Sequence, residues 1–243
     1  MKIWKYSGGV FVPYESLTEA LGLDLLRKDV ISAVGAGGKT TILERLASEL
    51  SGHGRKVLTT TTTHLALPEE GVFFSDQPEE IIEVLGMRTV VIAGRRFGLD
   101  KIEGLPVDVY TDLCEAADTV LVEADGSRGL PLKTPAAHEP CIPPNTTRLL
   151  ILAGLDSIGY EIDEVCHRPD EVRRILKTFG DHRILPSDIG LLLREGYIEP
   201  YAGTCAATVI LNKADRMNRR EAAAEIAEML APVPVLMTGR SHI

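Results

Sequence analysis

The fold class of this chain follows from one stretch of its sequence, DVISAVGAGGKT at residues 29–40. An apolar, β-branched run opens the stretch, and a glycine-rich turn leads into residues 39–50, where Ile42, Leu46 and Leu50 lie on one helical face. A strand, a tight glycine turn and an amphipathic helix in this order form the first half of a βαβ unit. The stretch therefore predicts an α/β protein.

Apolar, β-branched runs recur along the 243-residue chain and alternate with helical patterns. Alternation of this kind builds βαβ units, whose strands lie parallel and whose helices cover both faces of the sheet. We therefore predict a three-layer α/β fold with a mostly parallel sheet flanked by helices. The predicted strands are residues 29–34, 56–61, 89–93, 119–122, 148–153, 207–211 and 234–237.

Polar signals mark the predicted helix ends, and two segments interrupt the alternation. Apolar spacing predicts a helix over 169–179 that ends at Gly180. Residues 1–28 precede the first βα unit, and prolines within 131–144 exclude a helix or a central strand there. We predict one domain, 1–243, with an N-terminal extension and a proline-rich insertion at 126–147. Helix-start spacing is found for Ser16 with Glu19, Asp76 with Glu79, and Asn218 with Glu221.

The composition excludes several classes of protein. Lys and Arg total 26 against 35 Asp and Glu, so the net charge is −9 and general binding to nucleic acid or anionic membranes is not expected. No apolar run approaches the ~18 residues that cross a bilayer, and we expect neither a secretory signal nor a location outside the cytoplasm. No CxxC pair suggests a zinc site or a disulfide framework among Cys114, Cys141, Cys166 and Cys205.

Residues 33–40 match the Walker A pattern, with Ala33 in place of its first glycine. Glycines let backbone N–H groups approach phosphate oxygens, and the helix N-terminus adds partial positive charge. We expect Lys39 to reach the β- and γ-phosphates and the Thr40 hydroxyl to bind Mg²⁺, which predicts a P-loop NTPase fold. The residues expected to contact nucleotide here are Gly35, Ala36, Gly37, Gly38, Lys39, Thr40 and Thr41.

Two other interpretations of the glycine turn remain. It could simply join a strand to a helix. Gly35-Ala36-Gly37 also begins a dinucleotide-binding GxGxxG, but the third glycine would fall at Thr40. The Walker A interpretation is favoured because a predicted strand precedes the turn and a predicted helix follows it.

A second motif, Glu123-Ala124-Asp125-Gly126, ends the apolar strand at 119–122. A carboxylate at the tip of a neighbouring strand holds the Mg²⁺ shell in P-loop proteins, and a glycine can offer its N–H to the γ-phosphate. Glu123 has the right spacing to Gly126 for the metal role. Asp125 is the alternative ligand and, with Lys39, a candidate catalytic residue. A solvated acidic loop is the competing interpretation.

A third motif, Asn212-Lys213-Ala214-Asp215, matches the Asn-Lys-x-Asp of guanine-specific GTPases. The two oxygens of the Asp215 carboxylate suit the N1–H and exocyclic amine of guanine, whereas adenine presents a lone pair at N1. Lys213 would pack over the base and Asn212 would hold the loop. GTP is therefore the expected nucleotide, with ATP as the alternative.

A run of threonines, residues 59–63, is followed by His64. The first of them suit a β-branched strand. Residues 61–64, at and just beyond the end of the predicted strand, could position water or sense the nucleotide. Thr61 is the candidate catalytic residue among them, and His64 is a further candidate for which a packing or surface role is the alternative. A packing or surface role is favoured for His138 and for Cys166-His167.

The combined motifs resemble those of the YqeC family, from about residue 30 to residue 215. Asp170 and Cys141 depart from the pattern we expect of the family, and neither lies in the nucleotide motifs. The segments that carry the resemblance are 34–41, 59–64, Glu123-Ala124-Asp125-Gly126-Ser127, Pro131-Leu132-Lys133, His138-Glu139-Pro140, His167-Arg168-Pro169 and Asn212-Lys213-Ala214-Asp215.

The family is described as a selenium-dependent hydroxylase accessory or selenium cofactor biosynthesis protein. The resemblance implies a P-loop NTPase that helps mature molybdenum hydroxylases, with a client hydroxylase or cofactor-maturation protein as partner and a homodimer as one option. The chain is also similar to the class of GTPases that includes nickel-insertion proteins. The insertion, with Lys133, His138 and Glu139, would contact the client or a selenium species, or be a rigid excursion. Arg128 and Arg168 are the candidate arginine fingers.

Three functional hypotheses follow from the sequence. The favoured one is a Mg²⁺-dependent GTPase with slow turnover until a partner completes its site. An ATP-dependent kinase or ligase acting on a small acceptor is the second. A regulatory module that binds nucleotide without turnover is the third.

Overall fold

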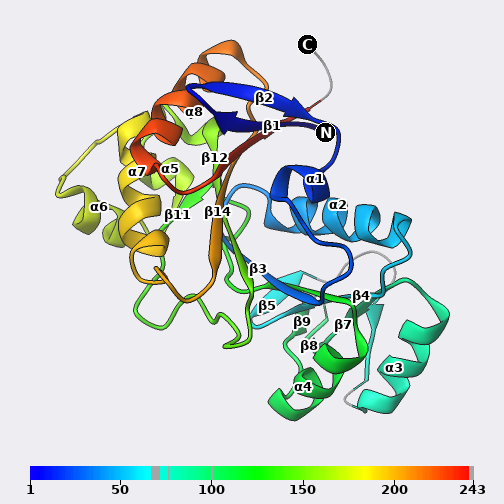
Figure 1. Cartoon of the computed structure of the whole chain (residues 1–243). Coiled ribbons are helices and arrows are strands. Elements are labelled where there is room, and N and C mark those ends of the chain that lie inside the picture. Colours follow the sequence, from blue (N-terminus) through cyan, green and yellow to red (C-terminus); the bar gives the residue numbers. More distant parts are fainter. Residues whose placement is uncertain (67–71, 76, 100, 241–243) are drawn as a thin grey trace.

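The computed structural model describes residues 1–66, 72–75, 77–99 and 101–240, and Figure 1 shows its arrangement. The described residues build a ten-stranded main sheet in which eight strands are parallel, and β1 runs antiparallel to both of its neighbours. Its order is β2 (Val10–Tyr14), β1 (Lys2–Ser7), β15 (Val235–Gly239), β14 (Ala206–Asn212), β12 (Arg148–Gly154), β3 (Asp29–Gly35), β10 (Thr119–Glu123), β4 (Val57–Thr61), β7 (Val90–Ala93) and β6 (Val72–Phe73).

Helices cover both faces of this sheet, so the predicted three-layer α/β fold is confirmed. One face packs against α1 (Leu17–Leu21) and α2 (Lys39–Gly52). Each of the strands predicted from the sequence is present, with ends shifted by at most two residues. The opposite face packs against α3 (Pro78–Met87), α4 (Val107–Ala116), α6 (Pro169–Leu176), α7 (Pro186–Leu193) and α8 (Met217–Leu230).

Alternating side chains along β3 explain the two cores. Val30 and Val34 enter the larger core with the α3, α4 and α6–α8 helices, whereas Ile31 and Ala33 face α2. Side chains on a strand point alternately to opposite faces, so a strand buried on both sides is apolar throughout. This is why residues 30–34 are apolar except for Ser32, whose buried hydroxyl forms a hydrogen bond with the Thr146 hydroxyl at 2.8 Å.

Two of the predicted helix ends are wrong. Helix α6 ends at Leu176, because Lys177 takes a left-handed conformation (φ 52°) and its N–H donates to the Arg173 carbonyl. Phe179, the last residue of the helix predicted over 169–179, lies outside α6 and is 93% exposed. Helix α8 begins at Met217, so Asn218 lies inside its first turn and does not cap it.

The other helix-start signals have different outcomes. The Ser16 hydroxyl accepts a hydrogen bond from the Glu19 N–H at 3.1 Å, so the predicted start of α1 is confirmed. Helix α3 begins with Pro78 at its first position, and Asp76 lies outside the described residues. No helix of the described chain is both long and apolar enough to cross a bilayer.

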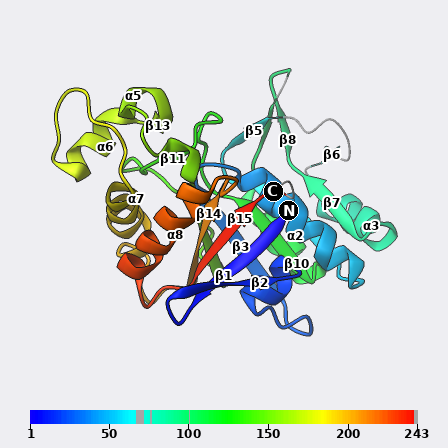
Figure 2. The same ribbon diagram turned by 90° about the horizontal axis from the view of Figure 1, so that it is seen from above.

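The N-terminal extension and the insertions add small elements around the main sheet. The hairpin β1–β2 continues the sheet beyond β15, as Figure 2 shows from above. A second sheet has the order β5 (His64–Ala66), β9 (Lys101–Glu103), β8 (Arg95–Phe97). The proline-rich insertion contains no helix and contributes only β11 (Leu132–Lys133), which pairs with β13 (Cys166–His167). The remaining short helices are η1 (Leu155–Ser157), α5 (Ile162–Val165) and η2 (Arg194–Ile198).

Candidate functional site

The glycine turn lies between β3 and α2, where neighbouring backbone approaches it closely. Gly35, Gly37 and Gly38 have φ values of 88°, 89° and 123°, which side-chain-bearing residues rarely adopt. A Cβ on Gly35 would lie 2.3 Å from the Leu152 carbonyl oxygen, and one on Gly37 would lie 2.4 Å from the Gly154 nitrogen. Glycine is therefore required at these positions by the contact with β12 as well as by the turn.

The ammonium group of Lys39 lies inside this turn and is surrounded by oxygen atoms. Lys39 is 3% exposed, and its Nζ donates to the Gly35 carbonyl oxygen at 2.7 Å. The same Nζ lies 3.2 Å from Asp125 Oδ1 and 3.8 Å from Glu123 Oε1. A buried charge needs such partners, because desolvation is costly when it is not compensated.

Glu123 and Thr40 form the second part of the site. Strand β10 lies beside β3 with Glu123 opposite Ala33, and the Thr40 hydroxyl donates to Glu123 Oε2 at 2.9 Å. Burial raises the pKa of Glu123, while Lys39 and the Thr40 hydrogen bond act in the opposite direction. A hydroxyl and a carboxylate are hard oxygen donors, and two such ligands with water and phosphate oxygens are the set that Mg²⁺ prefers.

The described residues hold no group of three or more His, Cys, Asp and Glu side chains that could bind a metal alone. A metal ion at Thr40 and Glu123 would therefore need oxygen atoms from a ligand or from water. The donor chemistry fits a Mg²⁺ ion that arrives with a nucleotide, and does not fit a resident zinc ion.

Asp125 lies behind the glycine turn and is completely buried. Its Oδ2 accepts hydrogen bonds from the Gly35 N–H at 3.0 Å and from the Tyr197 hydroxyl at 3.2 Å, and lies 3.3 Å from Lys133 Nζ. Glu123, not Asp125, is the carboxylate bonded to Thr40. Tyr197, which comes from η2, was not predicted, because no sequence motif connects it to Asp125.

The Asn-Lys-x-Asp motif joins the glycine turn at the end of β14. Asn212 Nδ2 donates to the Gly37 carbonyl oxygen at 2.8 Å, and its Oδ1 accepts from the Thr238 hydroxyl at 2.8 Å. A Cβ on Gly38 would lie 2.4 Å from Asn212 Nδ2. Asn212 therefore fixes the turn to the strand that carries the motif.

The other two motif residues lie further along the same edge. Lys213 has a left-handed backbone (φ 64°), and its Nζ lies 2.8 Å from Asp156 Oδ2. Asp215 is half-buried, and its Oδ1 accepts from the Arg240 N–H just after β15. The Asp156 contact was not anticipated from the sequence.

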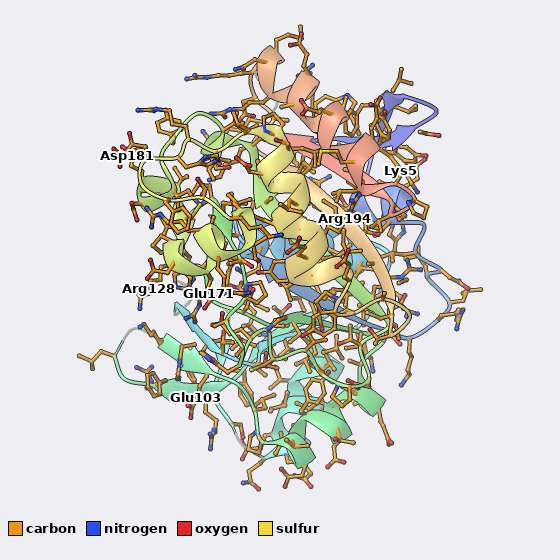
Figure 3. All side chains as sticks on the ribbon, turned by 90° about the vertical axis from the view of Figure 1, so that its left-hand side faces the viewer. Lys5, Glu103, Arg128, Glu171, Asp181 and Arg194 are labelled. Atoms are coloured by element: carbon orange, nitrogen blue, oxygen red, sulfur yellow. The ribbon has the colours of Figure 1, made fainter. Side chains whose placement is uncertain are left out.

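A cavity of about 500 Å³ brings most of the predicted nucleotide-contacting residues together. Four other predicted contacts do not line it, namely Gly35, Ala36, Asn212 and Asp215. His64, Arg128 and Lys101 also line it, and Lys101 was missed because it comes from the small sheet. Figure 3 marks Arg128 and, on the same strand as Lys101, Glu103. The predicted residues in its wall are Gly37, Gly38, Lys39, Thr40, Thr41, Glu123, Gly126 and Lys213.

The threonine segment passes beside this cavity. Thr61 is buried, and its hydroxyl donates to the Glu123 carbonyl oxygen at 2.8 Å and accepts from the Thr63 N–H at 3.0 Å. The Thr62 hydroxyl donates to the Cys141 carbonyl oxygen at 2.7 Å. The ring of His64 packs on Phe97, with 4.0 Å between the ring centroids. The segment therefore contacts both β10 and the insertion.

The remaining cysteine and histidine candidates lie at the β11–β13 pair or in the insertion. Cys166 is buried, and burial raises the pKa of its thiol to about 12. Partial burial, together with Lys133 and Arg168, lowers the pKa of His167. Both groups are thus uncharged at neutral pH. His138 is exposed in the insertion.

Comparison with known proteins gives the family. A family model described as YqeC protein matches residues 31–170. The chain belongs to the YqeC family. A protein of Escherichia coli (strain K12), named Uncharacterized protein YqeC, is 33% identical over 226 residues, covering 88% of this chain and 87% of the relative. The resemblance drawn from the motifs is thereby confirmed. Residues 31–170, which the family model matches, include the glycine turn and Glu123 but not Asn212.

The close packing of the turn generates a testable prediction. We expect Gly37→Ala to lower the free energy of unfolding by about 2 kcal/mol or more, because its Cβ would meet β12 backbone in a left-handed conformation. Gly126→Ala is the matched control, since nothing lies within 4 Å of its Cβ position. Urea denaturation measures both, and equal stability of the two variants would contradict the account.

Proposed function

We propose that this chain is a Mg²⁺-dependent GTPase that serves as an accessory factor in maturing selenium-dependent molybdenum hydroxylases. One observation carries the nucleotide part: a buried lysine, a Thr–Glu oxygen pair and the Asn212 side chain all meet at one glycine turn. The hydroxylase part rests on the resemblance to the YqeC family.

The phosphate site is supported by the charge at the turn. Lys39 at the N-terminus of α2 supplies a full positive charge, and the helix N-terminus supplies a partial one. When nucleotide binds, the Lys39 ammonium group would leave the Gly35 carbonyl and the two carboxylates and contact phosphate oxygens instead. Lys101 and Arg128, in the same cavity, add positive charge on the side of the insertions.

Hydrolysis would require in-line attack of water on the γ-phosphorus, with GDP as the leaving group. Thr40 and Glu123 would hold Mg²⁺, which neutralises phosphate charge when bound. Thr61 would act by holding the 61–64 segment against Glu123, because its hydroxyl already donates and accepts there. Arg168 bonds Glu139 at 2.9 Å, so Arg128 is the better placed of the two candidate arginine fingers.

Guanine specificity is supported by the positions of Asn212 and Asp215 along the edge of the sheet. Asn212 bonds the turn, while Asp215 lies beside Gly239 and accepts from the Arg240 N–H. Asp215 Oδ2 would accept from the guanine N1–H, and the second lone pair of Oδ1 would accept from the exocyclic amine, whereas adenine lacks a matching donor at N1. Partner proteins are then expected to raise a slow basal turnover.

A second candidate function is favoured by a separate cavity of about 540 Å³ that the threonine segment, residues 61–64, lines. His64 lines both this cavity and the phosphate cavity. The other walls of the 540 Å³ cavity include Leu105, Tyr110, Cys141 and Ile142. A small acceptor held there could attack the γ-phosphorus through a hydroxyl in place of water. Kinase activity would leave phosphate on the acceptor, whereas GTPase activity releases free phosphate.

The phosphate site is tested by replacing its lysine. We expect Lys39→Ala to weaken MgGTP binding by about a hundredfold or more, because a buried cation facing phosphate is removed. Isothermal titration calorimetry measures the affinity, and the exposed Lys2→Ala on β1 is the control that should bind like the unchanged protein. Unchanged affinity of Lys39→Ala would refute the phosphate site.

The guanine assignment is tested by replacing one carboxylate oxygen of Asp215 with an amide nitrogen. We expect Asp215→Asn to weaken GTP binding about tenfold or more and to favour xanthosine triphosphate, since an amide donor then faces the carbonyl at position 2 of the base. Asp112→Asn, on the exposed side of α4, makes the same chemical change away from the site. A preference of the unchanged protein for ATP would overturn the guanine assignment and leave the phosphate site standing.

A further inference from the structure

Six side chains of alternating charge run from the glycine turn into the proline-rich insertion. Successive members of this charge row lie 3.8, 3.2, 3.3, 2.8 and 2.9 Å apart. Three are negative and three are positive, so the row is neutral as a whole. In order they are Glu123, Lys39, Asp125, Lys133, Glu139 and Arg168.

Lys133 is the middle cation, and it is fully enclosed. Its side chain is 0% exposed, and its Nζ donates to the Gly126 carbonyl oxygen at 2.7 Å and to Glu139 Oε2 at 2.8 Å. The third neighbour is Asp125 Oδ2, at 3.3 Å. The three donors of the ammonium group thus face three oxygen atoms.

Asp125 shares its charge between two lysines. Its Oδ2 has the Gly35 N–H, Tyr197 and Lys133 as partners. Its Oδ1 accepts no hydrogen bond from the described residues and has only the ion-pair contact with Lys39. Lys39 is therefore the one partner that Asp125 would lose if that ammonium turned to phosphate.

The two lysines compete for one buried carboxylate. Asp125 attracts Lys39 away from phosphate, and the strength of that attraction depends on how much of the carboxylate charge Lys133 already balances. Without Lys133, Lys39 would be the only cation among the described residues within 4.0 Å of Asp125. Lys39 would then be held more strongly at the back of the turn.

We propose that Lys133 is a positioning residue that keeps Lys39 available for phosphate by balancing Asp125. The inference rests on the proposed nucleotide binding and adds a residue from the insertion to it. Lys133 acts through Asp125 and Lys39 and has no need to touch the nucleotide.

The far end of the row explains how the insertion holds Lys133 in place. Partial burial would raise the pKa of Glu139, but hydrogen bonds from Lys133 and Arg168 outweigh it and lower the pKa to about 2. Glu139 is thus charged at every physiological pH. Arg168 precedes α6 and bonds the other Glu139 oxygen, so the row connects the turn to the insertion and to α6.

The test is a double-mutant cycle on MgGTP affinity, measured by calorimetry. We expect Lys133→Met to weaken binding about tenfold or more. The double variant Lys133→Met with Asp125→Asn should regain most of that loss, because the carboxylate that retains Lys39 is gone. Asp125→Asn alone completes the cycle, so that its own effect on the glycine turn is subtracted. Lys133→Arg, which keeps a positive charge beside Asp125, should lose less affinity than Lys133→Met. Thermal unfolding without nucleotide checks that each variant is folded.

The outcomes separate this inference from the proposed function. Absence of MgGTP binding in the unchanged protein would overturn both. Binding by the unchanged protein with equal affinity in Lys133→Met, or a double variant as weak as the single one, would overturn only the positioning role. If Lys133→Met does not fold, Lys133→Gln takes its place in the cycle, and an affinity equal to that of the unchanged protein would overturn the positioning role in the same way.

Discussion

The ion pairs of the Lys39 ammonium group are the interaction on which the rest of the site depends. A lysine that is 3% exposed must have anionic or polar partners, and here Gly35, Glu123 and Asp125 provide them. Strand β10 lies next to β3, so both acids of the Glu-x-Asp pair reach the turn and meet this requirement. Asp125 in turn contacts a second cation, Lys133, which connects the insertion to the turn.

The main sheet explains why residues far apart in the sequence meet at this point. Parallel strands end at the same edge, so β3, β10, β12 and β14 deliver the turn, the acids, Gly154 and Asn212 to one place. Close approach of β12 and Asn212 leaves room only for glycine at residues 35, 37 and 38. Packing and the proposed phosphate binding therefore require glycine at the same positions of the turn.

The sequence predicted the parts of the structure that depend on local patterns. The strands, the glycine turn, the start of α1 and the meeting of Lys39, Thr40 and Glu123 follow from periodicity and motif spacing. The end of α6 was mispredicted because Lys177 adopts the left-handed conformation that we expected of Gly180. Tyr197 and Lys101 could not be found, because tertiary packing alone brings η2 and the small sheet to the site.

The most direct measurement is a crystal structure of the protein with Mg²⁺ and a non-hydrolysable GTP analogue. Our account predicts that Lys39 Nζ leaves the Gly35 carbonyl for β- and γ-phosphate oxygens, with Thr40 and Glu123 at the metal and Asp215 at the base. A nucleotide bound elsewhere, with Lys39 still on the Gly35 carbonyl and Asp125, would contradict it.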